Sequence, residues 1–311
     1  MFPMTWVFLR RRRALFKRHI LVLIDVDDLN LIPFRHLKLY EFVIFAFDPK
    51  TSKDIDLNEY SIKLVKCKDN MQDIRYNLKF AYATSALGHV YVVNERTPMY
   101  WFLKEWYVQS YLEVYQITMD SFLWEVPHVC VFDLDNTLIT DEEEVQIRSP
   151  AVYDSLKCLH DMGCVLILWS YGNKEHVSHS MERTKLDNGI FDVVICEGYK
   201  NSSSIDKNNR VVIDNKKKIA YVEKSFYSDI DYKDKSTRLP KSPRVILYYL
   251  RKLGINYTKS LTLVDDLQTN DYAYDYFVKV KKSIEPLDDW DVYHDIILNN
   301  ITYHDDLFEK K

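Results

Sequence analysis

The sequence predicts an α/β fold in two parts: a doubly wound parallel sheet in the C-terminal part, preceded by a second, smaller α/β domain. Three observations predict it. Short apolar runs typical of buried strands alternate with helical patterns in both halves of the chain. The 311 residues suffice for about two domains. The pattern breaks around residues 125–128, so we place the domains at 1–125 and 126–311.

The N-terminal domain is expected to alternate strands and helices. The strands fall at residues 20–24, 42–47, 61–65 and 90–93, and the helices at residues 71–87 and 99–108. Asp25, Asp27 and Asp28 follow the first strand in a pattern that resembles PIN-type nucleases, although several other acids of that pattern are missing or shifted. We interpret this domain as a degenerate PIN-like scaffold.

The C-terminal domain shows the clearer alternation. Its strands are expected at residues 129–132, 164–169, 191–196, 261–264 and 277–280, and its helices at residues 150–162, 174–186 and 243–253. Ser242 and Pro243 form a typical helix start, with serine at the cap and proline in the first turn. A hairpin over residues 210–222 lies within an insertion of about 199–240.

Composition excludes several classes of protein. The chain is 47% hydrophobic and 28% charged, as globular proteins are, and its six glycines form neither a P-loop nor a G-x-G-x-x-G fingerprint. Its five cysteines contain no C-x-x-C pair, which favours free thiols in a reducing compartment. No apolar run approaches the ~20 residues of a membrane helix. These features predict a soluble intracellular protein without a membrane partner.

Charge is unevenly distributed along the chain. The formal net charge of −4 predicts no bulk affinity for nucleic acid, yet the first twenty residues hold six basic residues and no acid. The basic residues are Arg10, Arg11, Arg12, Arg13, Lys17 and Arg18. The arginine run could contact nucleic-acid phosphates, serve as a nuclear import signal, or pack against acids.

The most informative segment follows the strand at residues 129–132. Asp133 and Asp135 leave this strand two residues apart, with Thr137 next in the pattern. In an open parallel sheet, ligands gather at the carboxyl ends of strands. One carboxylate can act there as a nucleophile and the other as an acid and base, and such a cluster of like charges needs a cation.

Further polar residues follow along the chain, in the order hydroxyl, lysine and a second aspartate pair. Ser170 ends the strand at 164–169 with a hydroxyl that can bond a phosphate oxygen, although Tyr171 or Asn173 could do so instead. Lys241 stands before the helix start and can neutralise a phosphate, with Lys235 and Arg238 as competitors for that role. Asp265 and Asp266 end the strand at 261–264 and complete a site for a hard cation with Asp133.

These segments resemble the four motifs of the haloacid dehalogenase superfamily of phosphatases. The matching stretches are F-D-L-D-N-T-L from residue 132, L-W-S-Y-G-N from residue 168, Lys241, and V-D-D-L-Q-T-N from residue 264. The short stretch between Asp135 and Ser170 is similar to the open-site branch, which includes phosphatases of the RNA polymerase tail. The whole chain also resembles a family of nucleocapsid proteins of similar mass from baculoviruses and related insect viruses.

The resemblance implies a role for each matching residue. Asp133 would be the nucleophile and Asp135 the acid and base, Thr137 would orient their loop, and Ser170 and Lys241 would hold the phosphoryl oxygens. The ligands implied for Mg²⁺ are Asp133, the backbone carbonyl of Asp135, Asp265 and Asp266.

The resemblance also implies a function. It implies a magnesium-dependent phosphoprotein phosphatase in nucleocapsid assembly, located in the host nucleus and the virion. Its partners would be a phosphorylated basic DNA-packaging protein, attracted by the acids at residues 141–144, and other nucleocapsid proteins. Two alternatives remain at this point: a structural nucleocapsid component with a vestigial site, and a nucleic-acid-binding module in the N-terminal half. His176 and His179 are expected on an exposed helix face rather than at a metal.

Overall fold

The computed structural model describes residues 2–49, 55–119, 126–140, 145–197, 211–214, 219–222 and 240–308. The chain divides into two compact units, and the division is not a single cut in the sequence. The N-terminal unit comprises residues 1–126 together with 246–259 and 305–311, and the C-terminal unit comprises residues 127–245 and 260–304. The domain boundary that we predicted near residue 126 therefore coincides with the first division, and two later segments return to the N-terminal unit.

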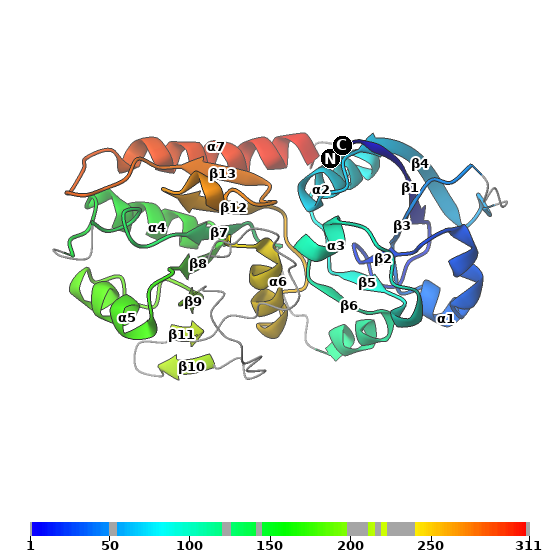
Figure 1. The fold of residues 1–311 in the computed structure, drawn as a ribbon, viewed down its shortest axis with the longest axis horizontal. Coiled ribbons are helices and arrows are strands. Elements are labelled where there is room, and N and C mark those ends of the chain that lie inside the picture. The colour runs from blue at the N-terminus through cyan, green and yellow to red at the C-terminus, as the bar shows by residue number, and fades with distance from the viewer. Residues whose placement is uncertain are drawn as a thin grey trace. The chain divides into compact units, whose positions relative to one another are not determined.

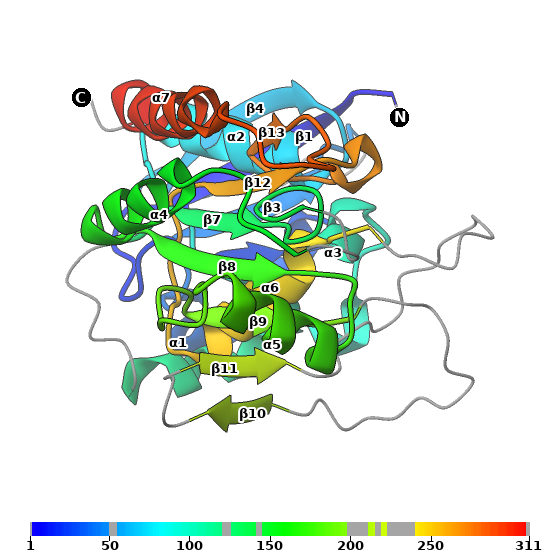
Figure 2. The same cartoon turned by 90° about the vertical axis from the view of Figure 1, so that its left-hand side faces the viewer.

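The C-terminal unit is built on a seven-stranded sheet, confirming the predicted α/β class. Its strands are, in spatial order, β10 (Val211–Asp214), β11 (Ile219–Val222), β9 (Val193–Ile195), β8 (Val165–Trp169), β7 (Val129–Phe132), β12 (Leu261–Asp265) and β13 (Tyr276–Lys279). All neighbours are parallel except β10 and β11, which form the predicted hairpin. Figure 2 shows the central strands from β11 to β12 in this order.

Three helices pack against one face of this sheet through apolar side chains. They are α4 (Ala151–Asp161), α5 (Lys174–Arg183) and α7 (Trp290–Phe308). Leu156 of α4, Met181 of α5 and Ile297 of α7 share one hydrophobic core with alternate strand residues such as Phe132. The intervening strand residues, among them Val131, are buried as well, as expected of a parallel sheet covered on both faces.

The N-terminal unit contains a six-stranded mixed sheet. Its strands are, in spatial order, β4 (Tyr60–Cys67), β1 (Met4–Arg11), β3 (Phe42–Ala46), β2 (Ile20–Val22), β5 (Val90–Val92) and β6 (Val108–Ser110). Strand β1 is antiparallel to both of its neighbours, and the remaining pairs are parallel. The unit therefore belongs to the predicted α/β class, while its likeness to PIN-type nucleases stays a prediction.

The remaining α-helices are short, except for α2 and α6. The α-helices are α1 (Phe34–Leu37), α2 (Met71–Tyr82), α3 (Phe102–Glu105) and α6 (Pro243–Lys252). The 3₁₀ helices are η1 (Val26–Leu31), η2 (Asn94–Arg96), η3 (Tyr111–Met119) and η4 (Gln268–Asn270). Helix α6 begins at Pro243, as the Ser242-Pro243 pair predicts.

Two predicted helices were wrong in their bounds, and one strand was missed. The helix expected over 71–87 ends at Tyr82, because Ala83 adopts the left-handed conformation with a φ of 46° and closes α2. The helix expected over 99–108 is reduced to α3, since residues 108–110 instead complete the parallel ladder beside β5. Strand β1 was missed because its residues are buried on both faces, which hides the two-residue alternation of a strand.

Helix α7 was also missed by the sequence analysis. Its 19 residues contain acids scattered among apolar positions, which obscures the apolar face of the helix. Trp290, Ile297 and Ile301 are buried and recur at helical spacing, a pattern that would have predicted the helix.

A buried carboxyl group makes the stability of the N-terminal unit depend on pH. Glu105 is 5% exposed and accepts hydrogen bonds from Met71 N at 2.7 Å and Trp101 Nε1 at 3.1 Å. Burial nevertheless raises its pKa from the ordinary 4.5 to about 7. Because the folded protein binds this proton more tightly than the unfolded chain does, the stabilisation is complete below the unfolded pKa and is lost as the pH rises through the folded pKa.

We therefore expect Glu105→Gln to reduce the pH dependence of stability. Between about pH 5 and about pH 8, the wild type should lose up to about 3 kcal/mol of unfolding free energy that the variant retains. Urea unfolding at both pH values measures this difference. Glu95→Gln, at an exposed position, is the matched control. An unchanged pH dependence in Glu105→Gln would assign the titration to another group.

Candidate functional site

The predicted site residues meet at one edge of the C-terminal sheet. Strands β8, β7 and β12 are neighbours and parallel, so their carboxyl ends lie side by side. Asp133 follows β7, Ser170 follows β8, and Asp265 is the last residue of β12. The backbone N–H of Asp133 donates to Val264 O at 3.0 Å, which continues the ladder up to the site.

Lys241 occupies the centre of the acidic cluster. It is fully buried, and its Nζ donates to an Asp133 carboxylate oxygen and to Asp265 Oδ2 at 2.9 Å. Burial lowers the pKa of Lys241, but the two adjacent carboxylates outweigh that effect and raise it overall, so the ammonium remains charged. Lys235 and Arg238, the competing candidates, lie outside the described residues.

Thr137 joins the two acidic segments. Its Oγ1 donates to Asp133 Oδ2 at 2.8 Å and accepts from the backbone N–H of Asp266 at 3.1 Å. Asn136, one residue earlier, has a φ of 62°, and this left-handed turn brings the threonine back over Asp133. The structure thus places Thr137 where it orients the loop.

Arg148 holds the same loop from the other side, and the sequence analysis did not identify it. Its fully buried guanidinium donates to Thr137 O at 3.3 Å and forms a two-pronged ion pair with Asp289, both contacts being 2.8–2.9 Å. The hydrogen bonds from Arg148 hold the pKa of Asp289 below its usual value. No local motif marks Arg148, because its partners are distant in sequence.

Asp135 is held by two side chains. Ser170 Oγ donates to Asp135 Oδ2 at 2.9 Å, and His176 Nε2 lies 2.7 Å from Asp135 Oδ1. The backbone N–H of Gly172 donates in turn to Ser170 Oγ at 2.9 Å. Ser170 therefore stands in the site as predicted, but in this structure its hydroxyl orients the carboxylate of Asp135.

The expectation that His176 lies on an exposed helix face was wrong. Asn173 caps α5 by accepting from the His176 backbone N–H at 2.8 Å, so the first turn of the helix faces the site. A Cβ on Gly172 would lie 2.4 Å from His176 Cδ2, so glycine is needed for the imidazole to reach Asp135. His179, one turn later, is exposed as expected. A glycine four residues before a histidine, just after a strand end, was the available signal.

Three carboxylates could hold a metal ion here. One oxygen each from Asp133, Asp265 and Asp266 all lie within 4.8 Å of one another. Burial raises the pKa of Asp133 to about 7, and the charge of Asp265 adds to this effect against the opposing influence of Lys241. Burial and Asp265 also raise the pKa of Asp266. A hard divalent cation would relieve this repulsion, so the donor set fits Mg²⁺.

The two acids at the end of β12 differ in what their oxygens contact. Asp265 accepts from the backbone N–H of Leu267 at 2.7 Å and from Asn270 Nδ2 at 2.9 Å, in addition to Lys241. The Asp266 carboxylate accepts no hydrogen bond within the part of the chain that the structure describes. Asp266 is therefore the better placed of the pair to bind a cation directly.

Comparison with known proteins assigns the chain to a family. Residues 4–309 match the model of the family described as "Protein of unknown function (DUF705)". The chain belongs to this family. The chain is 44% identical over 313 residues to the "Uncharacterized 38.0 kDa protein in P143-LEF5 intergenic region" of Autographa californica nuclear polyhedrosis virus, with 98% of each chain covered.

Two further relatives come from another polyhedrosis virus and a granulosis virus. The "Uncharacterized 36.0 kDa protein" of Orgyia pseudotsugata multicapsid polyhedrosis virus is 40% identical over 306 residues, covering 97% of each chain. The 41.0 kDa relative of Cryptophlebia leucotreta granulosis virus is 40% identical over 98% of this chain and 86% of its own length. The chain is thus similar to baculovirus proteins over nearly its whole length, which confirms the viral resemblance. None of these names states an activity.

The remaining sequence predictions fall in three groups. Asp25 and Asp28, which follow β2, lie 3.8 and 2.5 Å from Arg96, so this side chain forms an ion pair with each of them. The acids at residues 141–144 lie outside the described residues. All five cysteines are free, and no helix within the described ranges is long and apolar enough to cross a membrane.

Proposed function

We propose that this DUF705 protein is a magnesium-dependent phosphoprotein phosphatase of the haloacid dehalogenase type. The observation that carries the proposal is the arrangement around Asp133. This carboxylate lies against the buried ammonium of Lys241 and within reach of the Asp265 and Asp266 carboxylates. Asp135 leaves the same strand end and is held separately by its own partners. One carboxylate is thus placed for attack and the other for proton transfer.

In the first step, an Asp133 carboxylate oxygen attacks the phosphorus of a phosphate monoester. A bond forms between that oxygen and phosphorus, and the bond from phosphorus to the leaving oxygen breaks. Asp135, protonated, gives its proton to the leaving oxygen. Lys241 balances the negative charge of the transferring group, and its buried position makes that charge effective.

In the second step, water hydrolyses the aspartyl-phosphate. Asp135, now ionised, takes a proton from the water as it attacks phosphorus, and the Asp133–phosphorus bond breaks to release inorganic phosphate. His176 and Ser170 keep the Asp135 carboxylate in one orientation for both steps. Bound to Asp266 and Asp133, Mg²⁺ would supply charge neutralisation for the phosphoryl oxygens.

The segment between Asp135 and Ser170 favours a protein substrate. Its described residues form a tight turn, α4 and β8, and these elements belong to the core of the unit rather than to a separate cap. A phosphatase for small metabolites needs such a cap to exclude water and read the whole substrate. A phosphorylated side chain on a protein surface needs only access to the strand ends. Given the viral family, we propose a phosphorylated basic DNA-packaging protein and a role in nucleocapsid assembly.

The direct test is turnover of a phosphoserine peptide rich in arginine, with and without Mg²⁺. We expect chelation to abolish turnover and Asp266→Asn to reduce it by about a hundredfold or more. Asp271→Asn, an exposed acid in the same loop, is the matched control and should behave as wild type. A sugar phosphate turned over faster than the peptide would contradict the protein substrate. Absence of turnover on every monoester, with Mg²⁺ present, would favour a structural protein with a vestigial site.

His176 should act as a positioning residue for Asp135. We expect His176→Gln to lower kcat roughly ten- to a hundredfold with little change in KM, because the acid and base group loses its fixed orientation. Gly172→Ala should have a similar effect, since its Cβ would push the imidazole away. His179→Gln, one helical turn on, is the matched control. If His176→Gln and His179→Gln have equal turnover, the imidazole plays no part in the reaction.

A further inference from the structure

A basic pocket lies on the N-terminal unit, whose residues take no part in the site described above. Its volume is about 430 Å³, within the usual range for ligand sites. Four of the residues that line it are cationic, namely Arg10, Arg11, Arg12 and Lys17, and one is an acid, Glu41. The pocket forms where β1 ends and the chain turns back toward β2.

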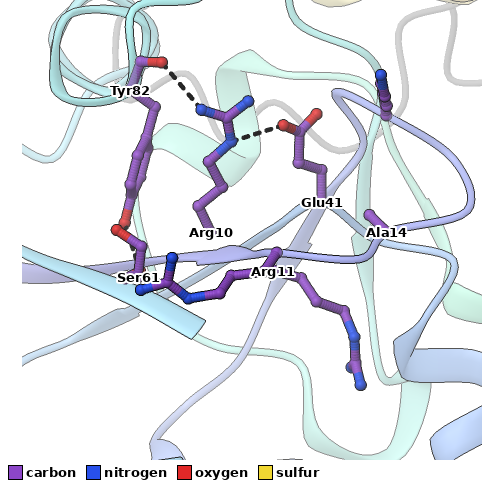
Figure 3. Close-up of a pocket in the computed structure, with 8 residues that line it drawn as sticks. Arg10, Arg11, Ala14, Glu41, Ser61 and Tyr82 are labelled. Carbon is purple, nitrogen blue, oxygen red and sulfur yellow. Dashed lines mark hydrogen bonds and ion pairs between the residues drawn. The ribbon is translucent and has the colours of Figure 1, made fainter. Parts of the chain in front are cut away.

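Two of the four cationic side chains already bind partners within the N-terminal unit. Figure 3 shows Arg10 between Glu41 and the backbone carbonyl of Tyr82, and its Nε lies 2.8 Å from Glu41 Oε1. Arg11 is 5% exposed, donates to Glu59 at 3.0 Å and lies over the ring of Phe34. Both arginines therefore stabilise the unit itself, and we exclude them from the group that is available to a ligand.

Arg12 and Lys17 remain available. Both are exposed, and among the described residues their only hydrogen-bond partner is Leu57, whose backbone oxygen accepts from Arg12 Nε at 3.2 Å. Neither forms an ion pair with any residue in the described ranges. Glu41 does not neutralise them, because one of its oxygens accepts from Arg10 and the other from the backbone N–H of Arg18 at 2.6 Å. The pocket thus carries an excess of positive charge.

The positive charge continues beyond the pocket. The backbone N–H of Leu15 donates to Lys38 O at 2.7 Å, which ties the turn after β1 to the end of α1. Arg13 on the turn and Arg35 on α1 are both exposed, and neither is ion-paired within the described part of the chain. Several like charges along two adjacent segments suit an extended polyanion better than a single small anion.

We propose that this basic surface, made of Arg12, Arg13, Lys17, Arg35 and Lys38, binds the phosphate backbone of nucleic acid. One phosphodiester enters the pocket at Arg12 and Lys17, and neighbouring phosphates meet the residues around it. Guanidinium groups bind phosphate and carboxylate oxygens equally well, so the spread of the cations decides between the two ligands. A nucleic-acid backbone presents closely and regularly spaced charges along its whole length, which suits unpaired cations on two adjacent segments. Binding is independent of base sequence, because the contacts go to phosphates.

The net charge of −4 does not oppose this interaction strongly. Charges more than about 8 Å away are largely screened at physiological ionic strength, so a phosphate at the pocket responds mainly to the local cations. The proposal is independent of the phosphatase site, and either can fail without the other.

The test is fluorescence anisotropy of a labelled DNA duplex of random sequence with the full chain, over a range of salt concentrations. Affinity should fall steeply with salt, because phosphate contacts release counterions. Arg12→Glu with Lys17→Glu should weaken binding by about tenfold or more and lower the salt slope by about 2. The milder pair Arg12→Gln with Lys17→Gln should fall between this variant and wild type.

The control is a double charge reversal at exposed positions of the C-terminal unit, Lys157→Glu with Arg183→Glu. It makes the same change in net charge and should leave DNA affinity near that of wild type. Thermal melts confirm that each variant folds. Equal losses in the two double reversals would overturn the proposal, because net charge alone would explain binding. Tighter binding of poly-glutamate than of DNA would also overturn it and indicate an acidic protein partner.

Discussion

Replacing Asp133 by asparagine is expected to abolish phosphatase turnover while the fold persists. The carboxamide has the same shape but cannot form the acyl-phosphate, so the rate should fall by more than about a thousandfold. Acid quenching of a reaction with labelled phosphopeptide should trap label on the wild-type chain and none on Asp133→Asn. Because burial raises the pKa of Asp133, removing its charge should not destabilise the protein above neutral pH.

The matched control for this variant is Asp161→Asn. Asp161 is an exposed acid at the end of α4, just before β8 begins, so it lies at the edge of the sheet opposite to the strand ends that form the site. Its turnover should equal that of wild type. If Asp133→Asn keeps turnover within about tenfold of wild type, the covalent mechanism is wrong.

Replacing Lys241 by methionine should produce the largest loss of stability. The ammonium is fully buried between Asp133 and Asp265, and its removal leaves two buried carboxylates without their cation. Breaking a buried ion pair in this way costs about 3–5 kcal/mol. We expect a loss of that size in urea unfolding at about pH 8 with chelator present, and partial recovery when Mg²⁺ is added.

The pH dependence separates lost charge from lost packing. Without Lys241, the pKa of Asp133 should rise further, so near pH 5 this carboxyl is protonated and the uncompensated charge largely disappears. The destabilisation of Lys241→Met should therefore be much smaller near pH 5 than near pH 8. Lys157→Met, at an exposed position on α4, should be close to neutral at both. An equal loss at the two pH values would mean that packing, not charge, explains the effect.

Local patterns predicted the C-terminal fold and most of its site. Continuous apolar runs marked β7, β8 and β12, and the polar residues directly after each run marked one sheet edge. Because parallel neighbours bring their carboxyl ends together, Asp133, Ser170 and Asp265 could be assigned to one place without knowing any distance. The N-terminal unit was harder, since β1 is buried on both faces and α3 is a single turn.

Contacts between distant segments could not be predicted in the same way. His176 reaches Asp135 from 41 residues away, and Arg148 reaches Asp289 from 141 residues away. No period or short motif records such pairs, because the geometry of the sheet and of the helix starts brings them together. The same holds for Arg10 and Arg11, whose run of basic residues gave no sign that each has a carboxylate partner.

By itself, the sequence determined which residues end the strands and which polar residues follow them at the candidate site. Hydrophobic burial acts through local patterns, so strand ends and the acids that follow them can be located from the chain alone. The tertiary structure decided how each charge is balanced. Lys241 lies between two carboxylates, the Asp266 carboxylate accepts no hydrogen bond within the described part of the chain, and Arg12 and Lys17 line an open pocket. Electrostatic energy depends on distance and burial in three dimensions, and sequence spacing does not contain those quantities.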